Sequence, residues 1–224
     1  MKKILAILFL FPFTALAQQD SVLSGAYNWQ QPAAQKNKIV PVVLLEGKVH
    51  DFEWMQWTAN TIAGSKEIKQ NVAGNQEQVI IIKSGSVTVH FGDSSFLLTA
   101  NSLAVLMPGE KYTLKNTAGG PCDFYCMKYR RGGSDEIKKS PADKSFVKIW
   151  ESIPFKSNTI GGGKRDFFER STAIQKRFEI HVSTLKEGIR SHDPHTHLAE
   201  EIVLLLNGDT EMQIGDQYLS LIHI

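Results

Sequence analysis

Two histidines and one carboxylate lie close together in the stretch from Gly188 to Gly208. His195 and His197 are two residues apart, so in a β-strand, where alternate side chains share a face, both imidazoles point to the same side. Glu201, four residues after His197, has the same parity. Imidazole and carboxylate groups together suit a divalent transition metal. We therefore predict a metal site with His195, His197 and Glu201 as its ligands.

Other polar residues of this stretch are not assigned as ligands. Glu200 has the opposite parity to Glu201, and Asp193 precedes Pro194 at the edge of a loop. His192 is ambiguous and fits a loop position better than a ligand position. The alternative interpretation of the whole stretch is a His-rich hairpin loop that binds nothing.

The spacing of these residues resembles the first sequence motif of the cupin superfamily, which is glycine, His-x-His, glutamate and a second glycine. Here the motif consists of Gly188, His195, His197, Glu201 and Gly208. The resemblance implies a small antiparallel β-barrel that holds a metal ion inside through two histidines, a glutamate and a further histidine from a second motif. It does not identify catalytic residues, which stay unknown.

The chain also repeats itself at an offset of 123 residues. Residues 77–85 fall on 200–208, residues 92–93 on 215–216, and residues 56–62 on 179–185, with apolar positions and turn glycines in agreement. Short strand signals recur at 39–45, 55–62, 79–82, 86–91 and 96–98, with glycines between several of them. Together, repeat and resemblance predict an all-β fold of two tandem cupin barrels, which are double-stranded β-helices or jelly rolls, the second of them incomplete.

The first copy lacks the residues that would bind a metal. Val72 takes the place of His195, Gly74 that of His197, and Gln78 that of Glu201. The second cupin motif fits residues 108–116 with one residue deleted, and Tyr112 takes its histidine position. We therefore expect a structural role for the first copy, and a ligand-binding role for its cavity is the alternative.

The second copy is expected to be cut short. At the same offset, the histidine of its second motif falls near position 235, so the fourth ligand and the last strands lie beyond residue 224. Residues 218–224 resemble a sequencing adaptor translated in frame, and His223 is for this reason not assigned as a ligand.

The first residues predict a secretory signal peptide. Lys2 and Lys3 precede an apolar stretch that ends in Ala15-Leu16-Ala17, so cleavage is expected after Ala17 and the mature protein is expected in the periplasm or outside the cell. The predicted divisions are 1–17 signal peptide, 18–38 N-terminal arm, 39–130 first cupin domain, 131–164 linker and 165–224 second cupin domain.

The amino-acid composition limits the classes of partner that the protein is expected to bind. Without Lys2 and Lys3 the chain has 23 basic and 23 acidic residues, and this neutral balance disfavours nucleic-acid binding. No membrane association is expected after cleavage of the signal peptide. Cys122 and Cys126 lie too far apart along one predicted strand for a disulfide and are expected to be buried.

Two functions fit these features. The first is an exported enzyme of the dioxygenase or hydrolase (aminohydrolase-like) type that uses one divalent metal, Mn, Fe, Ni, Co or Zn, to act on a small polar or oxygenated molecule. The alternative is a non-catalytic module that binds a small molecule or a carbohydrate. A homodimer is compatible with both.

Overall fold

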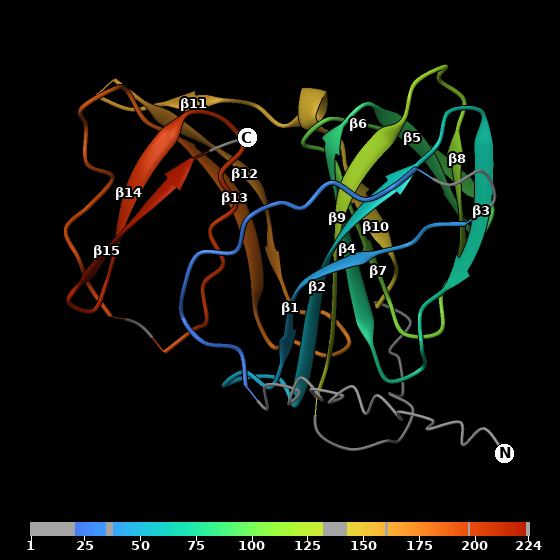
Figure 1. Cartoon of the computed structure of the whole chain (residues 1–224), viewed down its shortest axis with the longest axis horizontal. Helices are drawn as coiled ribbons and strands as arrows, with labels where there is room; N and C mark the ends of the chain where they lie inside the picture. Colours follow the sequence, from blue (N-terminus) through green and yellow to red (C-terminus); the bar gives the residue numbers. More distant parts are fainter. Residues whose placement is uncertain (1–20, 35–37, 132–142, 160, 197, 223–224) are drawn as a thin grey trace, which may run out of the picture.

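A computed structural model of the protein describes residues 21–34, 38–131, 143–159, 161–196 and 198–222. The described chain is almost entirely β-structure and forms two groups of strands that lie next to each other (Figure 1). We call residues 42–148 the first unit and residues 156–222 the second unit. The expected signal peptide lies outside the described residues. In the described part, no helix is long and apolar enough to cross a membrane.

The first unit consists of two facing sheets. Its strands are β1 (Val42–Gly47), β2 (Trp54–Ile62), β3 (Lys66–Asn71), β4 (Glu77–Ser84), β5 (Ser86–Phe91), β6 (Ser94–Thr99), β7 (Leu103–Leu106), β8 (Lys111–Asn116), β9 (Cys122–Arg130) and β10 (Phe146–Lys148). One sheet has the order β1-β2-β9-β4-β7-β10 and the other the order β3-β8-β5-β6. Eight strands, β2 to β9, divided between two antiparallel sheets in this order form a jelly roll. The predicted all-β jelly-roll fold is thus confirmed.

Strict alternation of side chains places the core of this unit between its sheets. In β5, Val87 and Val89 are buried, whereas Thr88 and His90 are only partly covered. On the larger sheet, Ile80 and Ile82 of β4 face the same core. A register slip of one residue would turn this apolar set outward, so the pattern determines the pairing.

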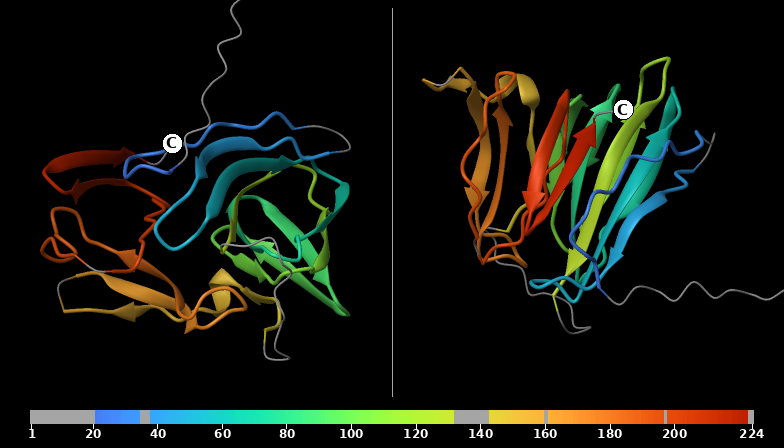
Figure 2. Two further views of the ribbon diagram at one scale, coloured as in Figure 1. Left: turned by 90° about the horizontal axis from the view of Figure 1, so that it is seen from below. Right: turned by 60° about the vertical axis from the view of Figure 1, so that its left-hand side comes forward.

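The second unit is smaller and more open. A sheet of β11 (Lys156–Ser157), β12 (Gly163–Arg170) and β13 (Phe178–Thr184) lies on one side, and the hairpin of β14 (Asp209–Ile214) and β15 (Gln217–Ile222) on another (Figure 2). β14 and β15 begin and end 123 residues after β5 and β6. The β12–β13 pairing has a register shift between Asp166 and Phe168, and the β1–β2 pairing has one between Val43 and Leu45, at the same offset.

A second apolar cluster fills the space between the two units. The outer face of the larger sheet contributes Met55 and Trp57, and the second unit contributes Phe178 and Ile180. The region predicted as a linker adds to this layer: β10 pairs with β7, and the short 3₁₀ helix η1 (Trp150–Ser152) follows it. Trp29 of the N-terminal arm packs edge-on against Tyr125, with ring centroids 4.8 Å apart.

Candidate metal centre

The structure places the predicted ligands between β13 and β14, in a segment without strands among its described residues. His195 and Glu201 are both exposed, and His197 lies outside the described residues. The prediction of a strand through residues 195–206 is therefore wrong for the described part of this segment. The physical reason is pairing: in the first unit, the corresponding strand β4 pairs with β9 on one side and β7 on the other. Among the described residues of the second unit, no strand pairs with residues 200–207.

His195 is nevertheless oriented by its neighbours. Its Nδ1 lies 3.2 Å from the carbonyl oxygen of Asp193, and its ring lies 4.6 Å from the ring of His192, centroid to centroid. A carbonyl oxygen only accepts hydrogen bonds, so Nδ1 is the donor in this contact. The neutral imidazole then carries its lone pair on Nε2, which is one of the two ring nitrogens through which a neutral histidine binds a metal.

The two adjacent glutamates of the segment have different surroundings. Glu200 reaches the first unit, where its Oε1 accepts a hydrogen bond from the backbone N–H of His50. The assignment of Glu200 as a non-ligand is consistent with this contact. Within the described residues, no group of three His, Cys, Asp or Glu side chains converges on one point. The donor types therefore fit a metal, whereas the described positions of His195 and Glu201 do not form a closed site.

In the first unit, side chains at positions that correspond to predicted metal ligands contact each other. Gln78 of β4 donates through Nε2 to the hydroxyl of Tyr112 in β8, at 2.7 Å, and lies 2.9 Å from the sulfur of Cys126 in β9. Gln78 and Tyr112 are the residues that take the glutamate and histidine positions of the two motifs. All three side chains are buried. The first jelly roll thus contains a hydrogen-bonded cluster at these positions.

This cluster is uncharged at neutral pH. Burial raises the pKa of the Tyr112 hydroxyl well above its usual range and that of the Cys126 thiol to about 11. Gln78 cannot ionise. Sequence reasoning identified Gln78 and Tyr112 but missed Cys126, whose inward parity in β9 was the available signal.

A second residue that the sequence analysis missed is Glu77. Its side chain is fully buried between the two units and accepts hydrogen bonds from the hydroxyls of Tyr129, at 2.5 Å, and Thr172, at 2.8 Å. The backbone N–H of Ile174 donates to it at 2.9 Å. Desolvation raises the pKa of the Glu77 carboxyl, and these hydrogen bonds oppose the rise. A glutamate at the start of an apolar strand was the signal in the sequence.

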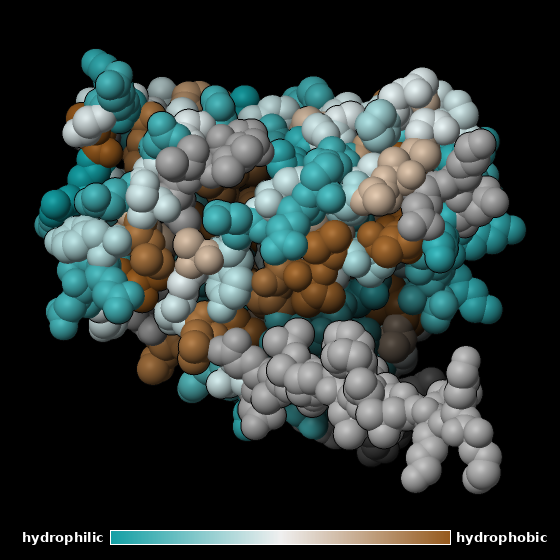
Figure 3. Space-filling model, viewed as in Figure 1, coloured by the Kyte–Doolittle hydropathy of each residue, from teal (hydrophilic) through white to brown (hydrophobic). Residues whose placement is uncertain are grey.

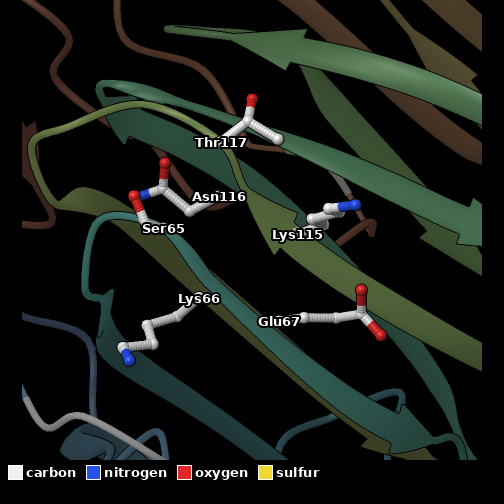
Figure 4. A pocket seen from close by; sticks show the side chains of 6 residues that line it. All are labelled: Ser65, Lys66, Glu67, Lys115, Asn116 and Thr117. Atoms are coloured by element: carbon white, nitrogen blue, oxygen red, sulfur yellow. The ribbon is translucent and has the colours of Figure 1, made fainter.

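A hollow at the start of β3 and the end of β8 lies apart from these residues (Figure 4). It is lined by Ser65, Lys66, Glu67, Lys115, Asn116 and Thr117. Lys66 points away from Glu67 and Lys115 in this view, so the charged groups do not converge on a ligand position. The hollow does not contain any of the predicted site residues.

No protein-family model matches the sequence, and no curated protein matches it. Similar solved structures include a protein of Pseudomonas aeruginosa named as glyoxylate-induced, with 14% identity, coverage of 69% of this chain and 64% of that one, and a TM-score of 0.46. A cupin superfamily protein from Desulfitobacterium hafniense has 13% identity, coverage of 45% and 84%, and a TM-score of 0.35. A cupin 2 conserved barrel domain protein from Salinispora arenicola has 11% identity, coverage of 47% and 90%, and a TM-score of 0.38. These likenesses concern the fold alone.

Proposed function

We propose that the chain is a tandem cupin protein whose second unit binds one divalent metal ion through His195, His197 and Glu201. The main support comes from the first unit, where Gln78 and Tyr112 meet inside the jelly roll. These are the positions that correspond to Glu201 and to the histidine of the second motif. The matching bounds of the two hairpins, β5–β6 and β14–β15, support the same correspondence.

The residues of the second unit would supply two neutral imidazoles and one carboxylate. The carbonyl of Asp193 holds His195 in the tautomer that presents Nε2. This donor set suits Mn, Fe, Ni, Co or Zn. When bound, such an ion acts as a Lewis acid or activates a water molecule. We propose an enzyme of the dioxygenase or hydrolase type on a small polar or oxygenated molecule, and a non-catalytic module for a small molecule or carbohydrate as the second candidate.

The first unit would then have a structural role. Its neutral cluster of Gln78, Tyr112 and Cys126 joins strands of both sheets through hydrogen bonds. Its outer face, with Met55 and Trp57, is covered by the second unit. We also propose export, with cleavage after Ala17, because of the sequence pattern of residues 1–17.

Metal analysis of the purified chain tests this proposal. The wild type is loaded in turn with each of the five ions, and its metal content and affinity are compared with those of His195→Ala, His197→Ala and Glu201→Gln. Each variant should bind at least about tenfold more weakly than the wild type. His90→Ala, a half-buried histidine of β5 in the first unit, is the matched control and should bind normally.

Wild-type affinity in all three site variants would contradict the proposed ligands. The metal-loaded protein is then screened for turnover of diols, flavonols, oxalate and ureides, with oxygen uptake recorded. Turnover supports the enzyme, whereas saturable binding of a compound without turnover supports the binding module.

A further inference from the structure

A buried carboxylate connects the two units. Glu77 is at the start of β4 in the first unit, and the loop that follows β12 in the second unit provides Thr172 and the backbone N–H groups of Ala173 and Ile174 as donors. Tyr129 of β9 adds a donor from the first unit. A buried carboxylate is costly unless such hydrogen bonds satisfy it, so the loop and Glu77 depend on each other.

The opposite contact is made from the second unit to the first. Glu200 accepts a hydrogen bond from the backbone N–H of His50, in the loop that precedes β2. Glu200 lies 123 residues after Glu77, and Ala173 lies 123 residues after His50. A glutamate of each unit thus accepts backbone N–H groups from the corresponding loop of the other unit.

The apolar layer around these contacts contains corresponding residues of both units. Met55 and Trp57 of β2 lie in one cluster with Phe178 and Ile180 of β13, which are the residues at the same offset. Ile81 and Leu204 form a further pair of this kind in the cluster. When corresponding residues of two units exchange contacts in this way, the interface between the units has an approximate two-fold axis.

We propose that Glu77 and Glu200 are two reciprocal latches that hold the units face to face about an approximate two-fold axis. The two latches differ in strength. Glu77 is fully buried and has several donors, whereas Glu200 is exposed and receives one backbone hydrogen bond from the first unit. Glu77 is therefore the main latch. Neither latch needs a bound metal, so the inference stands apart from the proposed metal site.

Hydrogen exchange of the full chain without added metal tests the latches directly, because the amides of Ile174 and His50 donate to them. Glu77→Gln should increase exchange at Ile174 on the order of tenfold. It should also increase exchange at His50, since both amides depend on one interface. Glu200→Gln should increase exchange at His50 more than at Ile174. Glu67→Gln, on the exposed side of β3, is the control and should change neither amide.

Exchange at Ile174 in Glu77→Gln within the range of the control would overturn the proposal, and so would unchanged exchange at His50 in Glu200→Gln. If Glu77→Gln does not fold, Thr172→Val replaces it, because this change keeps the carboxylate and removes one of its donors, together with the acceptor of the Gln175 N–H. Exchange at Ile174 should rise in Thr172→Val and return to the wild-type rate in Thr172→Ser, which restores the hydroxyl. Equal exchange in both Thr172 variants would overturn the proposal.

Discussion

The side-chain amide of Gln78 lies 2.7 Å from the hydroxyl oxygen of Tyr112, and this hydrogen bond joins the two sheets of the first jelly roll. Both residues are buried, so solvent does not compete for the contact. The bond occupies the positions where the sequence motifs of a metal-binding cupin place a glutamate and a histidine. The neutral Gln78–Tyr112 pair thus connects the two sheets at the positions where those motifs place a carboxylate and an imidazole.

The first prediction concerns this pair. Tyr112→Phe removes the hydroxyl and leaves the Gln78 amide with one partner fewer in a buried site. We expect the free energy of unfolding to fall by about 1–2 kcal/mol, as measured by denaturant titration. Tyr27→Phe, whose exposed hydroxyl donates to the carbonyl of Leu23, is the control and should change stability by less than about 0.5 kcal/mol. Equal losses of stability in the two variants would show that the hydrogen bond between Gln78 and Tyr112 does not stabilise the fold.

The second prediction concerns pH. Burial raises the pKa of Glu77 above its usual 4.5, so the folded chain keeps this proton at pH values where the unfolded chain has lost it. The contribution of Glu77 to stability is therefore largest below pH 4.5 and declines as pH rises from there through the raised pKa. Thermal unfolding at a series of pH values should show this decline in the wild type and a flatter profile in Glu77→Gln. A decline of the same size in the variant would assign it to another group.

The third prediction concerns the cysteines. Cys122 and Cys126 are both buried and free, as the sequence analysis expected. Burial raises their thiol pKa values to about 12 and about 11, so both are protonated near neutral pH. The native protein should react with a disulfide reagent on the order of a hundredfold more slowly than the guanidinium-unfolded chain, because the thiolate is the reactive form. Fast reaction of the thiols in the native chain would contradict the burial of Cys122 and Cys126.

The fourth prediction compares two turn glycines with positive φ. A Cβ at Gly85, where φ is +75°, would lie 2.7 Å from the carbonyl oxygen of Pro121, whereas a Cβ at Gly92, where φ is +53°, would meet no atom within 4 Å. Gly85→Ala adds a backbone clash to the conformational strain, so it should cost about 1–3 kcal/mol more than Gly92→Ala. Denaturant unfolding of the two variants measures this difference. Equal losses would mean that the backbone moves away without cost.

The fifth prediction concerns processing. When the chain is produced in a bacterium with a secretory pathway, the periplasmic protein should begin at Gln18, as measured by intact mass. Ala17→Asp places a charge where signal peptidase requires a small side chain, and the precursor should accumulate. A cytoplasmic product that keeps residues 1–17 would contradict the predicted signal peptide.

Local patterns predicted β1, β2, β4, β5 and β6 of the first unit, but they indicated no strand at β3, β7 or β8. The alternation in residues 86–91 and the turn at Gly92 indicated a strand, and β5 has these bounds. The same reasoning was wrong for residues 195–206, where the His195–His197 spacing and the apolar run of residues 202–206 indicated a strand but the described segment has none. A strand needs partners for its backbone N–H and C=O groups, and alternation within one segment contains no information about them. The position of His197, outside the described residues, stays a prediction.

The sequence by itself determined the all-β class, because alternating apolar residues and turn glycines specify short strands wherever they occur. It also determined that two imidazoles and one carboxylate, those of His195, His197 and Glu201, lie within one short stretch. Only the tertiary structure decided which side chains meet: Cys126 with Gln78 inside the first unit, and Glu77 with Thr172 across the two units. These residues are far apart in the chain, and their contacts arise from the packing of whole sheets, which also excludes the water that would otherwise satisfy them.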